Sequence, residues 1–154
     1  MADLTLAAGS VRLLTVGHGT ASQAEFAELL TEAGIQALVD VRIAPGSRKF
    51  PHFGKDLMAE WLPKAGIRYR WERRLGGFRK LPPESPDTAL RNDSFRAYAS
   101  YMRSDDFRAA AAALVDEASD VPTAIMCSET LWWGATVGSL LTTASCSPGC
   151  RWNT

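Results

Sequence analysis

The chain has 154 residues, of which 46% are hydrophobic and 22% are charged, and its formal net charge is zero. This composition predicts one globular domain with a sizeable core and excludes a disordered or fibrous chain. A neutral total also excludes a global field that draws the protein to nucleic acid or membrane, so any anion must bind at a local cluster of charge.

The N-terminal part of the chain has the pattern of a β-α-β unit. Residues 12–16 are an apolar run that stops at Gly17-His18-Gly19, which predicts a buried strand entering a tight turn. Ser22 and Glu25 have capping-box spacing and open a predicted helix that Gly34 ends. The mainly apolar residues 35–41 then predict a second strand of the kind found in parallel sheets.

The rest of the chain continues the alternation of helices and strands. We expect a loop over 43–54, a helix over 55–64, a half-buried strand over 67–71, an irregular segment over 72–90, and helices over 94–102 and 105–118. A last strand follows Pro122 and ends at Cys127. This order predicts an α/β fold, a single three-layer domain with a mostly parallel sheet flanked by helices. We place the domain in residues 1–133 and an atypical tail in 134–154.

Polar residues follow three of the predicted strands. His18 follows the first, Asp40 and Arg42 end the second, and Cys127 and Glu129 end the last. Carboxyl ends of parallel strands share one edge, where ligands bind in open sheets, so these groups can converge. Catalytic roles are therefore expected for Cys127, Glu129 and His18. The plainer alternatives are a turn with a satisfied histidine, a structural ion pair and a buried inert thiol.

Two basic clusters provide local positive charge. One holds Arg68, Arg70, Arg73, Arg74, Arg79 and Lys80 with the aromatic residues Tyr69, Trp71 and Phe78 between them, and the other holds Arg48, Lys49 and Lys55. Such clusters suit a nucleotide or single-stranded nucleic acid, although a solvated strand face has the same composition. Glycines allow close approach, and the N–H groups at the start of the helix that follows His18 are available to an anion. The expected ligand-binding residues are Gly17, Gly19, Asp40, Arg42, Ser47, Arg48, Arg73, Arg74, Gly76 and Gly77.

Several other classes of protein do not fit the sequence. No apolar run approaches the roughly 18 residues that cross a bilayer, and no signal peptide is apparent, so we expect a cytoplasmic protein with no membrane partner. Three cysteines do not form a disulfide framework. No histidine lies near Cys146 and Cys150 in sequence, so we expect no metal. We also expect no cofactor.

A set of short motifs resembles the family called domain of unknown function 488. They are V-G-H-G-T around Gly17, L-V-D-V-R-I-A-P-G-S-R over 38–48, F-P-H-F from Phe50, A-G-I-R-Y from Ala65, L-G-G from Leu75, F-R-A-Y-A-S-Y-M from Phe95 and M-C-S-E from Met126. The resemblance runs from Leu14 to Trp133. It implies a three-layer α/β domain and a polar site made by the histidine loop, the Asp-Val-Arg strand end and the Cys-x-Glu strand end. It implies no known reaction.

The sequence departs from this family after Trp133. The family continues with Arg-Cys-His-Arg, a helix and a strand, whereas this chain has Gly-Ala-Thr-Val and only one charged residue, Arg151, over 130–154. Residues 134–141, Gly-Ala-Thr-Val-Gly-Ser-Leu-Leu, can be encoded GGT GCC ACC GTC GGC TCA TTG CTG. In that choice of codons, one added C before them gives Arg-Cys-His-Arg-Arg-Leu-Ile-Ala. We therefore hypothesise that residues 134–154 are out of frame, and we expect them to be poorly ordered and any activity to be impaired.

Three functional hypotheses follow. The first is an enzyme-like site for a phosphate-bearing small molecule, in which His18, Arg42 and the Arg73–Arg74 region bind the anion and Cys127 with Glu129 carries out thiol or proton chemistry. The second is a nucleic-acid or nucleotide binding module without catalysis. The third is an inactive member of the family. A reactive Cys127 thiol would indicate the enzyme, and binding that weakens steeply with salt would indicate the module.

Overall fold

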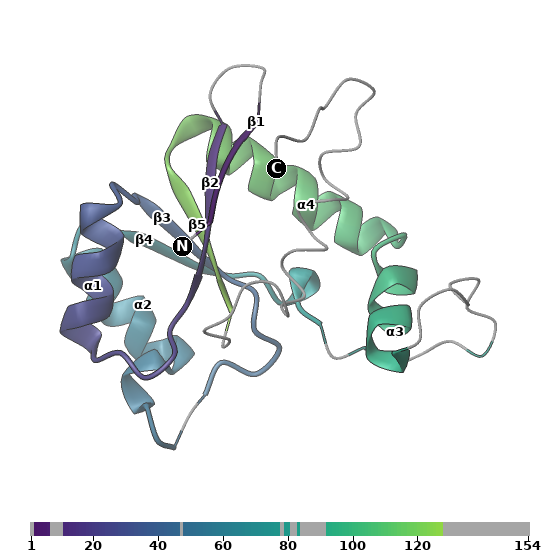
Figure 1. Ribbon diagram of the computed structural model, residues 1–154, viewed down its shortest axis with the longest axis horizontal. Coiled ribbons are helices and arrows are strands. Elements are labelled where there is room, and N and C mark those ends of the chain that lie inside the picture. Colours follow the sequence, from purple (N-terminus) through teal and green to yellow (C-terminus); the bar gives the residue numbers. More distant parts are fainter. Residues whose placement is uncertain are drawn as a thin grey trace.

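The computed structural model describes residues 2–6, 11–46, 48–77, 79–80, 83 and 92–127. In chain order the elements are β1 (Ala2–Leu6), β2 (Val11–Gly17), α1 (Gln23–Glu32), β3 (Ala37–Asp40), the 3₁₀ turn η1 (Pro51–Phe53), α2 (Lys55–Lys64), β4 (Arg68–Trp71), the 3₁₀ turn η2 (Arg73–Leu75), α3 (Asp93–Tyr101), α4 (Asp105–Asp120) and β5 (Thr123–Cys127). Figure 1 shows the sheet with α1 and α2 on one side and α4 on the other.

The five strands form one sheet in the order β1-β2-β5-β3-β4. β2, β5, β3 and β4 run parallel, and β1 is antiparallel to β2. The predicted α/β class with a mostly parallel sheet is confirmed. One feature differs from the sequence analysis, which does not predict β1. β5 lies between the two strands of the β-α-β unit, so β2 and β3 are not neighbours.

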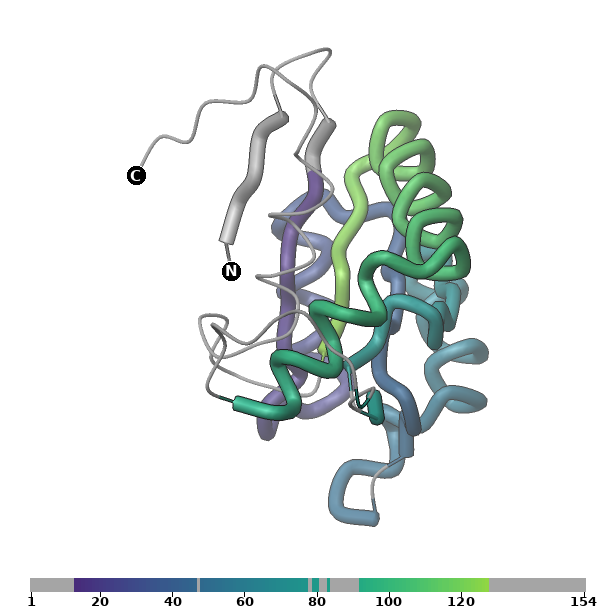
Figure 2. Tube along the Cα trace, turned by 90° about the vertical axis from the view of Figure 1, so that its right-hand side faces the viewer, coloured from purple at the N-terminus to yellow at the C-terminus, as the bar shows by residue number. Residues whose placement is uncertain are grey.

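Alternation along the strands separates two apolar layers. On one face, Leu14, Leu38 and Met126 pack with residues of α1 and α2, including Phe26 and Trp61. On the other face, Leu13, Val39 and Ile125 pack with residues of α3 and α4, chiefly Tyr98, Phe107 and Leu114. Figure 2, turned by 90°, brings α3 and α4 to the front. The sheet is therefore the middle of three layers.

Local sequence signals set most helix ends. Ser22 accepts from the amide of Glu25, whose side chain accepts from the amide of Ser22, so the capping box that was predicted is present. Ser104 caps α4, and Asp105 and Asp106 in its first turn complement the helix dipole. Pro63 lies in the last turn of α2.

Candidate functional site

The carboxyl ends of the parallel strands lie at one edge of the sheet. Gly17 of β2 is in register with Cys127 of β5, Met126 is in register with Asp40 of β3, and Asp40 with Trp71 of β4. The predicted site residues that follow β2 and β3 therefore lie at the same edge as Cys127. Glu129 and Ser47 lie outside the described residues.

The faces of the sheet divide this set. Asp40 and Arg42 lie on the α1–α2 face, where Arg42 contacts Phe53 and Met58 of that apolar layer. His18 lies there too, because its ring stacks on Phe53. Cys127 packs against the apolar cluster of the α4 face. The structure thus brings His18, Asp40 and Arg42 together and places Cys127 on the opposite face.

His18 is held in one orientation by its own loop. Nδ1 lies 3.0 Å from the carbonyl oxygen of Gly19, and the ring stacks on Phe53 with centroids 4.4 Å apart. Gly19 adopts φ +51°, a conformation that glycine tolerates. A carbonyl oxygen only accepts, so Nδ1 carries the proton and Nε2 presents a lone pair. Nε2 has no hydrogen-bond partner within the part of the chain that the structure describes.

The environment of His18 favours the neutral imidazole. The residue is only 9% exposed, and burial, aided by the nearby positive charge of Arg42, lowers the pKa of the imidazole below its usual 6.5, against the opposing effects of the Gly19 carbonyl and Asp40. His18 is therefore a neutral base near pH 7, with its lone pair on Nε2.

His52 is a second histidine beside this loop, and the sequence analysis did not assign it to the site. Its Nε2 lies 3.1 Å from the carbonyl oxygen of Ala21, so this nitrogen carries the proton. Its ring centroid is 4.4 Å from that of Phe53. Both histidines of the chain thus contact Phe53, and the F-P-H-F motif that places His52 next to Phe53 was the available signal.

Asp40 and Arg42 form a buried ion pair whose polar atoms are occupied. Oδ1 of Asp40 accepts from the amide and Nε of Arg42 at 3.0 and 2.8 Å, and Oδ2 accepts from Nη2 at 2.6 Å and from the Tyr69 hydroxyl at 2.9 Å. Arg42 Nη2 also donates to the carbonyl of Phe53. Asp40 is fully buried, and the Arg42 side chain is 7% exposed. Burial, followed by the charge of Asp40, raises the pKa of Tyr69 far above its usual range.

Glu72 organises the basic residues on the α4 face. Its carboxylate accepts from Nε and Nη2 of Arg74, each at 2.8 Å, and from Nη1 of Arg70 at 2.9 Å. Arg70 also donates to Glu117 of α4. The hydrogen bonds from Arg74 hold the pKa of Glu72 below its usual value. Arg70 and Arg74 are thus engaged with protein carboxylates, whereas Arg73 and Arg48 are exposed and form no ion pair with a described residue.

The aromatic residues between these arginines are also engaged. The Tyr69 hydroxyl donates to Asp40, and Nε1 of Trp71 donates to the carbonyl of Arg42 at 2.7 Å. Lys55 Nζ lies 4.7 Å from the Trp71 ring centroid, so it covers one face of the indole. Phe78 lies outside the described residues. A stacking platform for bases is therefore not preformed on this strand by the residues described.

Other expected ligand-binding positions take part in helix capping or in packing of the fold. The start of α1 is occupied by its own capping box, so the amides of Ser22 and Glu25 are not available to an anion. A Cβ at Gly76 would lie 2.4 Å from the carbonyl oxygen of Val41, so this glycine permits close packing of η2 on the end of β3. Gly17 lies within β2 beside Cys127, and Gly77 is half-buried.

A cavity of about 610 Å³ opens at the carboxyl ends of β3 and β4. It lies between the loop after β3, the start of α2 and the Trp71 ring. Its lining residues are Ile43, Ala44, Pro45, Gly46, Pro51, Gly54, Lys55, Asp56, Leu57 and Trp71. The cavity lies at the predicted edge of the sheet, but none of the described residues that the sequence assigned to the site lines it.

Residues 22–140 match the family described as Domain of unknown function DUF488. The chain belongs to this family. The match covers α1, α2, the Asp40–Arg42 pair, His52 and Cys127, and it ends within the tail. No curated protein and no solved structure matches the chain. No helix among the described residues has both the length and the apolar character needed to cross a membrane.

Proposed function

We propose that this DUF488 domain binds a phosphate-bearing small molecule at the carboxyl edge of its sheet, and that His18 acts on it as a general base. The state of His18 carries this proposal. The ring is buried, neutral near pH 7 and fixed by the Gly19 carbonyl, so that Nε2 presents its lone pair. A base in this state accepts a proton without first having to lose one.

Two cations that precede Phe50 in the loop after β3 support an anionic ligand. Lys49 Nζ lies 5.3 Å from the ring centroid of Phe50, and that ring meets the His18 ring at 6.4 Å. Arg48 precedes Lys49 and is exposed. Neither cation forms an ion pair with another described residue, whereas Arg42 and Arg74 are paired. We therefore assign anion binding to Arg48 and Lys49, and positioning of the loop to the Asp40–Arg42 pair.

The two histidines make a direct test possible. In a ¹⁵N-labelled protein, the ring signals of His18 and His52 are the only two of their kind and can be assigned with His52→Gln. Titration with inorganic phosphate should shift the His18 signals in a saturable way. Lys49→Ala should weaken the response, and Lys64→Ala, an exposed lysine at the end of α2, should leave it unchanged. His18 signals that ignore phosphate, or equal effects of both variants, would refute anion binding at this site.

Cys127 separates this proposal from thiol chemistry. We treat it as structural because it packs against the apolar cluster of the α4 face. It should react with iodoacetamide no faster than a free peptide cysteine near pH 7. A faster reaction, measured against Cys127→Ser, would transfer the catalytic role to the thiol and to Glu129.

A nucleic-acid binding module is the second candidate function. The basic strand β4 supports it less well than His18 supports the small-molecule site. Arg70, Arg74, Tyr69 and Trp71 are already bound within the fold. Binding of a single-stranded oligonucleotide that falls steeply with salt and persists in His18→Asn would favour this module over the small-molecule site.

The reading frame of residues 134–154 is a separate proposal, and these residues lie outside the described part of the chain. We propose that one base is missing beside the Trp133 codon, because codons that encode residues 134–141 read Arg-Cys-His-Arg once a single C is added before them. Sequencing the genomic locus decides the matter. If the locus contains the extra base, phosphate binding should be measured on the protein translated in the corrected frame. If the locus lacks it, the frameshift is refuted.

A further inference from the structure

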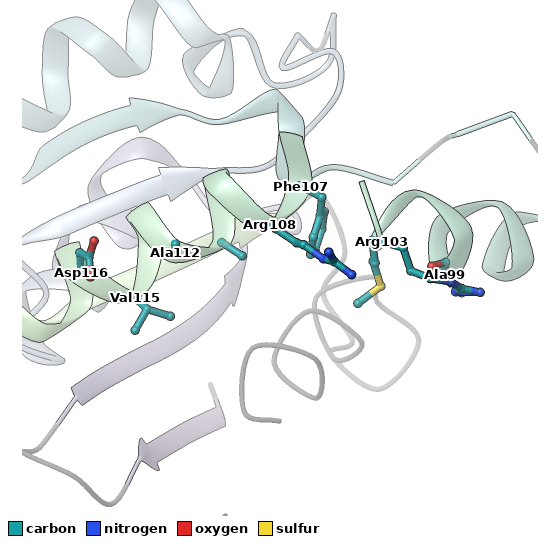
Figure 3. A pocket seen from close by; sticks show the side chains of 9 residues that line it. Ala99, Arg103, Phe107, Arg108, Ala112, Val115 and Asp116 are labelled. Atoms are coloured by element: carbon teal, nitrogen blue, oxygen red, sulfur yellow. Dashed lines mark hydrogen bonds between the residues drawn. The ribbon is translucent and has the colours of Figure 1, made fainter. Parts of the chain in front are cut away.

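A groove runs along one flank of α4, away from the site described above. Its volume is about 680 Å³, and the described residues that line it come from α3, α4 and the turn between them: Ala99, Met102, Arg103, Phe107, Arg108, Ala111, Ala112, Val115 and Asp116. Figure 3 shows Ala112, Val115 and Asp116 along α4, with Phe107 and Arg108 nearer to α3. Most of the lining is apolar, and charged groups stand near its two ends.

The exposed residues of this flank follow the helix. Arg108, Ala112 and Asp116 are four residues apart and exposed, and Ala111 and Val115 beside them are half-buried. The buried residues of the same helix are Phe107, Ala110, Leu114 and Ala118, and of these only Phe107 also lines the groove. α4 therefore has a second stripe that none of the described residues covers, with an apolar centre and a charge of opposite sign on either side.

The charges of this stripe are complementary to those of the same stripe on a second, antiparallel copy of α4. Arg108 and Asp116 lie at equal distances, about 6 Å of helix rise, on either side of Ala112. Two copies of α4 that cross antiparallel about a two-fold axis at Ala112 place each Arg108 opposite the partner's Asp116. A parallel arrangement would instead set arginine against arginine.

We propose that this flank of α4 docks a second copy of the chain, and that the two copies form a two-fold dimer through antiparallel α4 helices. Closed symmetric dimers use the same surface patch on both subunits, as this stripe requires. Neither Arg108 nor Asp116 forms an ion pair with another described residue of its own chain. The second copy provides the missing partner for each charge and covers Ala112 and Val115.

Charge reversal tests this interface on the full-length chain. Sedimentation velocity over a wide concentration range should show a reversible dimer. Arg108→Asp and Asp116→Arg should each weaken it by about tenfold or more, because like charges then face each other. The double variant should restore the dimer, since the opposite-charge pairs are re-formed. Glu28→Arg, a comparable exposed change on α1, is the matched control and should have no effect.

Each result decides the proposal. A chain that stays monomeric at every concentration overturns it, and so does a dimer that ignores the single reversals or responds equally to Glu28→Arg. Because Arg108 and Asp116 are exposed, their variants should keep the far-ultraviolet circular dichroism of the parent. Rescue in the double variant distinguishes a charge pair across the interface from a general loss of structure.

Discussion

Two charge clusters at the same edge of the sheet use the same local geometry on opposite faces. Asp40 and Arg42 are two residues apart at the end of β3, and Arg70 and Glu72 are two residues apart at the end of β4. The first pair is shielded from water, since the side chain of Arg42 is only 7% exposed. Around Glu72, the side chains of Arg70 and Arg74 are 33% and 49% exposed. The difference shows that burial of the cation, more than the spacing, decides what each pair can do.

Arg42→Met should have the largest effect. It leaves the fully buried Asp40 carboxylate with the Tyr69 hydroxyl and the backbone amide but without its cation, and an uncompensated buried charge costs about 3–5 kcal/mol. Urea unfolding measures the loss. Arg68→Met is the control, because Arg68 is exposed on β4 and its removal should change stability by less than about 0.5 kcal/mol. Equal effects would contradict the contrast between buried and exposed arginines.

Gly76→Ala should follow. The new methyl group would meet the carbonyl oxygen of Val41 at 2.4 Å and the Ile43 side chain, so η2 must move away from the end of β3, at a cost of about 1–3 kcal/mol. Gly46→Ala is matched to it, because a Cβ there meets nothing within 4 Å. The two unfolding free energies should differ clearly. Similar values would mean that the close approach at Gly76 does not constrain the fold.

Glu72→Gln should cost less than Arg42→Met, about 1 kcal/mol, since water already screens its partly exposed arginines.

The stability that Glu72 contributes should also depend on pH in a definite direction. The pKa of Glu72 is lowered in the folded state, so its contribution is present above about 4.5 and is lost as pH falls through the folded pKa. The variant should therefore lose less stability in acid than the parent. Glu60→Gln, exposed on α2, should keep the parent's acid dependence.

The smallest effect concerns His18. Its pKa is lowered on folding, so the unfolded chain binds the extra proton first, and stability falls as pH drops from about 6.5 through the folded pKa. His18→Asn should flatten the stability profile in this window. Ring ¹⁵N shifts should also show the proton on Nδ1 of His18 and on Nε2 of His52. The opposite tautomer at His18 would remove the basis for its proposed role as a base.

Sequence reasoning located elements whose signals are local. The Ser22–Glu25 capping box, the helix over 55–64 and the strand ending at Cys127 depend on neighbours within one or two turns. It also brought Asp40 and Arg42 onto one face, because residues two apart on a strand point the same way.

Local sequence signals could not predict that the site residues are divided between the two faces of the sheet. Residues in register on neighbouring parallel strands point to the same side, and Gly17, not His18, is in register with Cys127. One residue of register therefore sends the histidine and the thiol to opposite faces. That register, and the place of β5 between β2 and β3, depend on pairing between distant segments. The same holds for the contact of both histidines with Phe53.

The central place of β5 also sets when this fold can form. Residues 123–127 separate the β1–β2 pair from the β3–β4 pair, and they are the last strand of the described chain to be synthesised. Until β5 leaves the ribosome, each half of the sheet is a two-stranded piece, which is marginally stable alone. The nascent chain therefore carries two incomplete halves from the synthesis of β4 until that of β5, and a single five-residue segment joins them.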